Sequence, residues 1–480
     1  MRLPLNAIRQ FSTKTYLSEA QMANTMTVTL LGTSSGGGPS LSRNCSSLVV
    51  DALGDGSLWM VDCAEGTLRQ FSRQPFSADN PHLRVSRINK MFVTHMHADH
   101  VMGIIPMLRN VLLPSPTGEA ALQFQPDPLP KIEIYGPAGI RTFVRSILKM
   151  TLTRTRNKYV VHELLTDDDK KTPCDPPEIM HVNEVAGRDI VCSEDGFWHS
   201  ISKERCRRAE VAVDAGPIAH RDPCLGFVFR ECSSPNRKIV VLGDTNDPSA
   251  IIPLCTNPSP SLLVHEATEA HIPRDIDPKS KRSFETVMEK ATARGHSLPQ
   301  MAGAFAKTIG AQKLVLNHIG GRFPAPGPND RNPIRGNVIA EIERQASEAW
   351  GMGTARAAWD FMRVAIPVPT EEVVDETESS AQAHSPSNSY EANFPTVYNT
   401  TAADTQPNNE PKLRGTFRGR GRGGRRGFHH HVSAQGHVNN TSTESGHGQQ
   451  QQHSQREGVQ HVDRSERRGT NGPNRTRARK

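Results

Sequence analysis

The stretch Thr94-His95-Met96-His97-Ala98-Asp99-His100 places four potential metal ligands directly after a short apolar run. The apolar run predicts a strand, and His95 and His97 are two positions apart, so both imidazoles can face one ion. Asp99 and His100 follow the turn and can reach a second ion. Neutral imidazole and carboxylate suit Zn²⁺, and an incomplete ligand shell leaves room for the water that a hydrolase needs. The stretch therefore predicts a hydrolytic metal centre.

Three more candidate ligands, His220, Asp244 and His318, each follow an apolar run of strand-like composition. Parallel and mixed sheets commonly display such side chains where their strands end. Any one of them alone is better explained as a surface histidine or a capping aspartate. Together with the first cluster they predict a site for two metal ions.

Apolar runs that alternate with loops from about residue 25 predict an α/β protein. Strands dominate at first and then alternate with helices, which indicates two sheets covered by helices, an αββα sandwich. Strands are expected at 25–31, 47–52, 58–62, 88–94, 131–135, 211–214, 225–230, 238–242, 261–264 and 313–317. Helices are expected at 101–112, 138–152, 283–294, 298–308 and 334–345, with a surface loop at 166–178.

The basic charge of the chain is concentrated at its C-terminal end. The chain carries 57 Lys plus Arg and 50 Asp plus Glu, yet residues 411–480 alone carry 15 and four, a net +11 that leaves −4 for the rest. Residues 371–480 contain one leucine and no isoleucine or tryptophan, so they cannot bury enough apolar surface to fold. Arginine alternates with glycine at 414–428, as in RNA-binding Arg-Gly segments; a solubilising tail is the alternative.

The N-terminal residues have a different composition. Arg2, Arg9 and Lys14 precede the first acidic residue, and apolar residues recur at helical spacing, which is typical of a mitochondrial presequence. A location in the mitochondrial matrix is therefore expected, and the alternative is an N-terminus of accidental composition. Translation from Met22 or Met26 would give a shorter form in the nucleus or cytosol.

Composition and segment boundaries complete the outline. Eight cysteines without a C-x-x-C pair exclude a disulfide scaffold and a cysteine-built zinc module. No apolar run approaches the roughly 20 residues of a membrane helix, so a soluble protein without a membrane partner is expected. The four parts are a presequence at 1–24, a catalytic domain at 25–368, a disordered linker at 369–410 and a basic disordered tail at 411–480.

Several short motifs lie outside the first cluster. They are Gly32-Thr33-Ser34-Ser35, Pro39-Ser40-Leu41-Ser42-Arg43-Asn44, Asp62-Cys63-Ala64-Glu65-Gly66-Thr67, His265-Glu266-Ala267-Thr268 and Gly295-His296-Ser297. With the H-x-H-x-D-H cluster they resemble the metallo-β-lactamase superfamily and, within it, ribonuclease Z, which trims the 3′ ends of precursor tRNA, especially its short form. The similarity covers about 27–325, and the H-E-A-T and G-H-S pieces are its most specific part.

The resemblance implies a ligand set for two Zn²⁺ ions per subunit, with Mn²⁺ as a substitute. His95, His97 and His220 would hold one ion, Asp99, His100 and His318 the other, and Asp244 would bridge them.

The resemblance also implies roles for other residues. Asp99 would act as general base on the metal-bound water, and Glu266 with His296 would protonate the departing 3′-oxygen. Arg43 and Asn44 would contact a substrate phosphate, the alternative being a simple turn. Asp62 is expected to support a ligand as a hydrogen-bond acceptor.

The implied function is a zinc-dependent endoribonuclease that removes 3′ trailers from precursor tRNA through a metal-bound hydroxide and leaves a 3′-hydroxyl. Relatives of this fold are often dimers, so a homodimer is expected. Leu41 replaces a family lysine, Leu298 replaces a threonine, and only 24 positions separate His220 from Asp244, where the family has a long tRNA-clamping arm. The alternatives are a hydrolase of small phosphodiesters or other esters, and an RNA-binding protein with a vestigial metal site.

Overall fold

The computed structural model describes residues 25–75, 82–118, 124–125, 127–206, 209–327 and 332–369. The expected presequence, nearly all of the expected linker and the whole basic tail lie outside the described residues. Within the described part of the chain, no helix has both the length and the apolar character that crossing a membrane requires.

The first of two sheets comes mainly from the N-terminal half of the domain. Its order is β16-β1-β2-β3-β4-β5-β6-β7, and β8 also pairs with β6. The strands are β1 Met26–Gly32, β2 Ser47–Asp51, β3 Leu58–Val61, β4 Ile88–Phe92, β5 Pro130–Pro137, β6 Lys158–Leu165, β7 Glu184–Val185, β8 Asp189–Val191 and β16 Arg363–Ile366. Pairing is antiparallel from β16 to β3 and parallel from β3 onward.

The second sheet follows in sequence and has the order β15-β14-β13-β12-β11-β10-β9. Its strands are β9 Trp198–Arg205, β10 Glu210–Ile218, β11 Cys224–Glu231, β12 Lys238–Leu242, β13 Leu262–Glu266, β14 Leu314–Asn317 and β15 Arg356–Ala357. The strands from β9 to β12 pair antiparallel, and those from β12 to β15 pair parallel.

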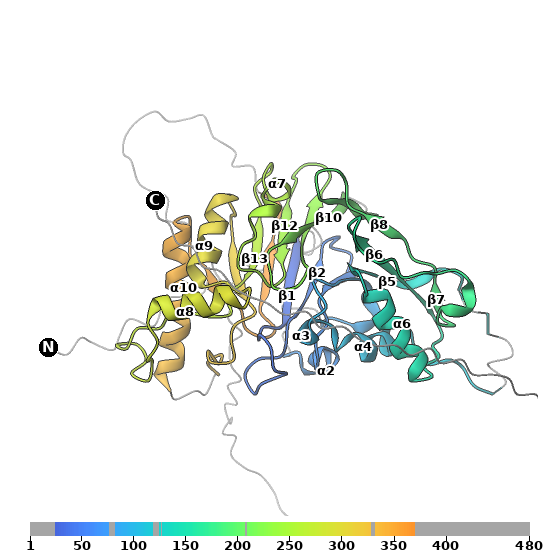
Figure 1. The fold of residues 1–480 in the computed structure, drawn as a ribbon, viewed down its shortest axis with the longest axis horizontal. Coiled ribbons are helices and arrows are strands. Elements are labelled where there is room, and N and C mark those ends of the chain that lie inside the picture. Colours follow the sequence, from blue (N-terminus) through green and yellow to red (C-terminus); the bar gives the residue numbers. More distant parts are fainter. Residues whose placement is uncertain are drawn as a thin grey trace, which may run out of the picture. The chain divides into compact units, whose positions relative to one another are not determined.

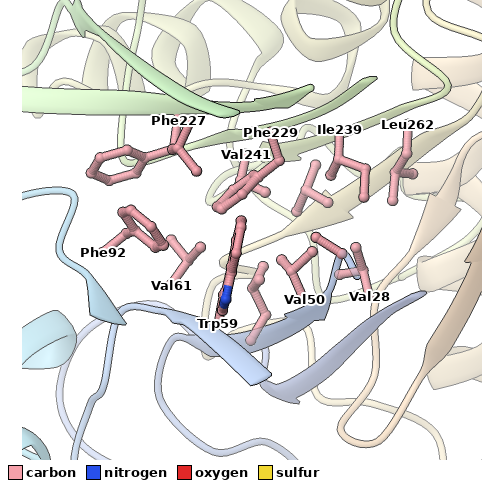
Figure 2. Close-up of a cluster of buried hydrophobic side chains, with 14 of the residues drawn as sticks. Val28, Val50, Trp59, Val61, Phe92, Phe227, Phe229, Ile239, Val241 and Leu262 are labelled. Carbon is pink, nitrogen blue, oxygen red and sulfur yellow. The ribbon is translucent and has the colours of Figure 1, made fainter. Parts of the chain in front are cut away.

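The two sheets pack face to face through large apolar side chains (Figure 2). The Trp59 ring lies 6.1 Å from that of Phe229, and the Phe92 ring lies 5.4 Å from Phe227 and 5.3 Å from Phe229. Because side chains alternate along a strand, Trp59 points between the sheets while its neighbour Met60 points to the opposite face. Strands buried on both faces explain their nearly continuous apolar sequences.

Helices cover the outer face of each sheet (Figure 1). Helices α4 (Ile104–Val111) and α6 (Ile140–Met150) pack on the first sheet, near α2 (Thr67–Arg73) and α3 (Ala98–Val101). Helices α9 (Pro299–Thr308) and α10 (Pro333–Trp350) pack on the second. The other helical segments are α7 Ile252–Cys255, α8 Phe284–Ala293, η1 Val85–Arg87, η2 Pro177–Ile179 and η3 Ser249–Ile251. The predicted αββα sandwich is therefore confirmed.

The helix predicted over 101–112 is confirmed over most of its length as α4, but its first residue belongs to the separate helix α3. Gly103 lies between them, and its amide donates to the Cys63 carbonyl. A Cβ at this position would lie only 1.9 Å from the Ala64 carbonyl oxygen, so the close approach requires glycine. The break at Gly103 lies three residues after His100, and the sequence pattern did not predict it.

Strands β6 to β9 were also not predicted. β7 has two residues and β8 has three, and β8 is largely exposed, so neither shows a clear apolar alternation. The expected surface loop at 166–178 precedes them and is confirmed. It is anchored by Arg141, whose guanidinium donates to the Thr172 carbonyl and pairs with Asp189 at 2.7 Å.

Candidate metal centre

The candidate ligands lie where strands end, at one edge of the sandwich. His95 follows β4, His220 follows β10, Asp244 follows β12 and His318 follows β14 directly. Strand β10 is antiparallel to β11, which is antiparallel to β12, so β10 runs in the same direction as β12 and the parallel strands beside it. The carboxyl ends of these strands therefore meet at the same edge, where α/β proteins usually bind ligands.

One group of potential ligands consists of His95, His97, His220 and Asp244, whose ligand atoms all lie within 4.8 Å of one another. Nε2 of His95 is 2.9 Å from Nδ1 of His97 and 3.7 Å from Oδ2 of Asp244. These are the three histidines predicted to share one ion, together with the predicted bridging aspartate.

A second group contains Asp99, His100 and His318, again within 4.8 Å. Nε2 of His318 lies 3.3 Å both from Oδ2 of Asp99 and from Nε2 of His100. Oδ1 of Asp244 is 3.5 Å from Nε2 of His100 and 3.2 Å from Nδ1 of His318. One oxygen of Asp244 thus faces each group, which is the geometry that a bridging ligand requires.

These residues fit a pair of metal ions. Two nitrogen ligands on tetrahedral Zn²⁺, with bonds of about 2.0–2.1 Å, are separated by roughly 3.3 Å, close to the ring-nitrogen separations here. Nε2 of His220 is buried and has no hydrogen-bond partner among the described residues, although buried polar atoms are nearly always satisfied. A cation in contact with these nitrogens would account for both features.

The other ring nitrogen of each histidine is held by the protein. The contacts are His95 Nδ1 to Thr94 Oγ1 at 3.0 Å, His97 Nε2 to Asp222 Oδ2 at 2.7 Å, His100 Nδ1 to Asp62 Oδ2 at 2.7 Å, His220 Nδ1 to the Gly295 carbonyl at 2.7 Å and His318 Nδ1 to Thr268 Oγ1 at 2.9 Å. Such contacts fix the ring orientation and tautomer of a metal-binding histidine.

Gly295 explains why a glycine begins the G-H-S motif. Its φ is +77°, a conformation that other residues rarely adopt. A Cβ there would lie 2.5 Å from Nδ1 of His220, the nitrogen that its carbonyl holds. Asp62 and His318 also have positive φ values, 54° and 52°, which non-glycine residues adopt mainly where the surrounding structure imposes them.

The candidate ligands differ in protonation state. Burial acts to lower the pKa of His100, but the charges of Asp244 and Asp62 outweigh it and raise the pKa well above its ordinary value, so this imidazole is charged. Burial, reinforced by the charge of His100, lowers the pKa of His95 to about 2, so its imidazole is neutral. Burial acts to raise the pKa of Asp99, but the hydrogen bond with His318 and the charge of His100 outweigh it, and the pKa lies well below its ordinary value. Asp99 is therefore ionised.

Glu266 and His296 form a pair beside the metal ligands. Oε1 of Glu266 lies 3.0 Å from Nδ1 of His296, and the carboxylate accepts from the amides of Thr245 and Thr268. Burial lowers the pKa of His296, but the hydrogen bond and charge of Glu266 outweigh it and raise the pKa above its ordinary value. His296 also lies within 4.8 Å of Asp244 and His318 by its ligand atom, so a ligand role is the alternative to that of a proton donor.

Comparison with known proteins gives the family. No protein-family model matches the chain. The chain is 30% identical to the human zinc phosphodiesterase ELAC protein 1, over 72% of this chain and 99% of that protein. The chain belongs to the ribonuclease Z family. A ribonuclease Z of Brevibacillus brevis is 29% identical, over 62% of this chain and 86% of the relative. A crystal structure of human tRNase Z, short form, is 30% identical with a TM-score of 0.48, covering 72% of this chain and all of that one.

The ribonuclease Z motif at 39–44 does not present its polar side chains as predicted. Arg43 is 2% exposed, and its guanidinium donates to Thr33 Oγ1 and to the Phe323 and Ala358 carbonyls. Asn44 is 3% exposed and its side-chain amide donates to the Glu65 carbonyl. These placements argue against the predicted phosphate contacts, because burial and internal hydrogen bonds fix this turn.

Several residues around the site were not predicted from the sequence. Asp222 contacts His97, and the Arg221 guanidinium also lies near this ring, with Nε 3.4 Å from Nε2 of His97. The Gly36 amide donates to Oδ2 of Asp99, and Thr268 contacts His318. Only Thr268 stood in a quoted motif. Asp222, Arg221 and Gly36 contact residues that are distant in sequence, so no short spacing pattern could have identified them.

The departures from the family pattern have structural counterparts. Residues 220–244 form two strands joined by a turn in which the Asn236 amide donates to the Ser233 carbonyl, so this interval contains no long arm. Leu298 is the N-cap residue of α9 and makes no side-chain capping bond, but it is buried against Val287 and Ala291. Leu41 is fully exposed.

Replacing Asp62 by asparagine should weaken metal binding without unfolding the domain. Asp62 accepts from the amide and hydroxyl of Thr94 and contacts Nδ1 of His100, so the change removes the acceptor that orients this imidazole. Loss of such a contact typically lowers metal affinity by about 10–100-fold. Metal content and competition with a chelator measure the effect.

Asp214→Asn is the matched control. Asp214 is as buried as Asp62, at 3% exposure, but it contacts Ser200 and Arg230 and no candidate ligand. It should retain its metal. Equal metal affinity in the two variants would contradict the supporting role of Asp62.

Proposed function

We propose that the protein is a zinc-dependent endoribonuclease that removes 3′ trailers from precursor tRNA and leaves a 3′-hydroxyl on the tRNA. The observation that carries this proposal is the convergence of seven predicted ligands in two adjoining groups, with the Glu266–His296 pair beside them. The names of the relatives, a zinc phosphodiesterase and a ribonuclease Z, support a phosphodiesterase that acts on RNA.

Two Zn²⁺ ions per subunit are the proposed cofactors, and Mn²⁺ is the expected substitute. His95, His97 and His220 would hold one ion, Asp99, His100 and His318 the second, and Asp244 would contact both. When bound, such ions lower the pKa of a shared water and stabilise the attacking and leaving oxygens of a phosphodiester.

The chain itself supplies the proton for the leaving group. Glu266 is 2% exposed, and two backbone amides donate to its carboxylate. The carboxylate therefore holds Nδ1 of His296 at a defined position. The raised pKa of His296 favours the imidazolium, which can donate a proton to a departing alkoxide. Asp99, whose Oδ2 lies 3.3 Å from Nε2 of His318, is proposed both as a ligand and as the general base.

The absence of the arm from residues 220–244 bears on how the substrate is held. A hydrolase of small phosphodiesters with the same metal centre is the second candidate, favoured by this absence alone. We propose that the basic tail at 411–480 helps to hold RNA, because its net charge is +11 whereas the rest of the chain carries −4. A complete set of converging ligands favours an enzyme over a binding protein with a vestigial site.

Cleavage of a precursor tRNA with mapped product ends tests the proposal against a small phosphodiester. The expected result is one cut after the discriminator base that leaves a 3′-hydroxyl, lost after exhaustive chelation and restored by Zn²⁺ or Mn²⁺. Turnover of the small phosphodiester alone would support the second candidate. Activity that survives chelation would contradict the proposal that the reaction depends on bound metal ions.

His296→Ala should slow precursor-tRNA cleavage by about 10²–10⁴-fold while the metal content stays unchanged, because the variant loses a proton donor and no ligand. Elemental analysis beside the rate measurement separates the two roles. His271→Ala is the control, because this histidine lies outside the candidate ligand groups. Loss of one metal equivalent in His296→Ala would show that His296 is a ligand.

Truncation after residue 369 should weaken precursor-tRNA binding and flatten its dependence on salt. Each phosphate that the tail neutralises contributes roughly 0.7–0.9 to the slope of log K against log salt. Turnover of a small phosphodiester should not change, because all the candidate ligands precede the truncation. Equal affinities and equal salt slopes for the full and truncated chains would contradict the proposed role of the tail in binding RNA.

A further inference from the structure

An open hollow of about 430 Å³, lined by apolar as well as polar side chains, lies between the C-terminal end of α4 and the connection from α6 to β6. Two guanidinium groups, Arg109 and Arg154, and three hydroxyls, Ser115, Thr151 and Thr153, contribute to its lining. The metal ligands do not contribute to it. The hollow therefore needs an explanation of its own.

The walls of the hollow are fixed by backbone hydrogen bonds between segments that are far apart in sequence. The amides of Arg156 and Asn157 donate to the carbonyls of Leu113 and Leu112, and the amide of Thr153 donates to Leu148. Nε2 of His181 contacts the Thr153 carbonyl at 2.7 Å. The cationic and hydroxyl groups are thus held on a braced surface.

The charge on these two segments has one sign. Residues 101–118 contain Arg109 as their single charged group, and residues 149–158 contain Lys149, Arg154, Arg156 and Lys158 without any acid. Arg109 and Arg154 are exposed, and neither has an ion pair with an acidic residue in the described ranges. Arg156 lies over the Phe124 ring at 5.2 Å, which keeps its charge at the surface.

The positive potential also acts on a nearby histidine. Burial is the main cause that lowers the pKa of His181. The hydrogen bond with the Thr153 carbonyl and the charge of Glu184 act to raise this pKa, and the charges of Lys149 and Arg154 lower it. Cations left without counter-charges repel one another unless an anion joins them. The arrangement therefore favours a polyanion over a neutral ligand.

The hollow is within reach of a substrate bound at the metal centre. Arg109 follows His100 by nine residues, most of them in α3 and α4. Nine residues separate the two Cα atoms by at most roughly 32 Å even when fully extended, and the helical parts shorten this distance. A nucleic-acid duplex that rises about 3.4 Å per base pair would cover it within about ten base pairs.

We propose that this hollow binds backbone phosphates of the RNA whose 3′ end lies at the metal centre. This inference rests on the proposed function. Guanidinium groups match phosphate geometry with two parallel hydrogen bonds, and hydroxyls provide further donors. Through this surface the folded domain itself can contact RNA. The contact matters because residues 220–244 form no arm and because the domain with its linker carries a net negative charge.

Charge reversal in the full-length protein tests the proposal. Arg154→Glu is compared with Lys307→Glu, an equal change of charge at an exposed lysine in the last turn of α9. Binding of precursor tRNA is measured over a range of salt concentrations, together with turnover of a small phosphodiester. Arg154→Glu should weaken binding by roughly tenfold or more and reduce the salt slope by about 1, because a phosphate contact is lost.

The controls separate the surface from the metal centre. Small-phosphodiester turnover should be unchanged in both variants, which also shows that both fold, and Lys307→Glu should bind precursor tRNA like the wild type. Arg154→Lys should keep the salt slope but bind precursor tRNA less tightly than the wild type, since it keeps the charge and loses the two parallel hydrogen bonds. A short RNA duplex without a trailer should compete for the surface, whereas inorganic phosphate at the same phosphate concentration should not.

The outcomes distinguish this proposal from the proposed function. If the wild type cuts precursor tRNA and Arg154→Glu binds it like Lys307→Glu, the surface is overturned and the function stands. If the wild type binds precursor tRNA without cutting it, and Arg154→Glu alone loses affinity, the function fails and the surface stands. Competition by inorganic phosphate as strong as that by the duplex would overturn an RNA-backbone site.

Discussion

The apolar contact between the two sheets is the interaction on which the candidate site depends. His95, His97, Asp99 and His100 follow a strand of the first sheet, whereas His220, Asp244 and His318 follow strands of the second. Neither of the two predicted ligand groups comes from one sheet alone, since each combines residues that follow strands of both. The rings of Trp59, Phe92, Phe227 and Phe229 hold the sheets together and so hold the ligands at bonding distance from one another (Figure 2). Close packing makes this spacing difficult to change, because a well-packed core resists small displacements.

A second layer of polar contacts then sets the orientation of each ligand. Asp62 is the clearest example, since one carboxylate accepts from Thr94, at the start of the ligand segment, and contacts His100 near its end. Its left-handed backbone shows that the surrounding structure imposes the conformation. Glu266 acts in the same way on His296 through two backbone amides. The histidines can therefore take up ions with little reorganisation, which is what makes a metal centre effective.

The sequence was informative about this site because the candidate ligands come directly after strands. Both the apolar run of a strand and the histidine or aspartate after it can be recognised in a sequence. His220, Asp244 and His318 were predicted in this way, and the structure brings them together with the first cluster. The phosphate contacts of Arg43 and Asn44 stay predictions, because polar residues in a loop look alike in sequence whether they face solvent or, as here, make hydrogen bonds within the protein. Asp222 was missed because its partner His97 is distant in sequence. The split between α3 and α4 was missed because the approach of Gly103 to Ala64 is a tertiary contact. The homodimer, the matrix location and the disorder of the tail stay predictions.

The pairing of β1 with β16 has a consequence for how the protein is made. Met26 lies opposite Ile366, so the first strand of the domain receives its outer partner only when the last strand has left the ribosome. At translation rates of about 5–20 residues per second, the interval is on the order of tens of seconds. During that time β1, which is buried along its whole length in the finished fold, has an open edge that can pair with other chains. Completion of the first sheet is therefore a late event, later than in a domain whose neighbouring strands follow each other in sequence.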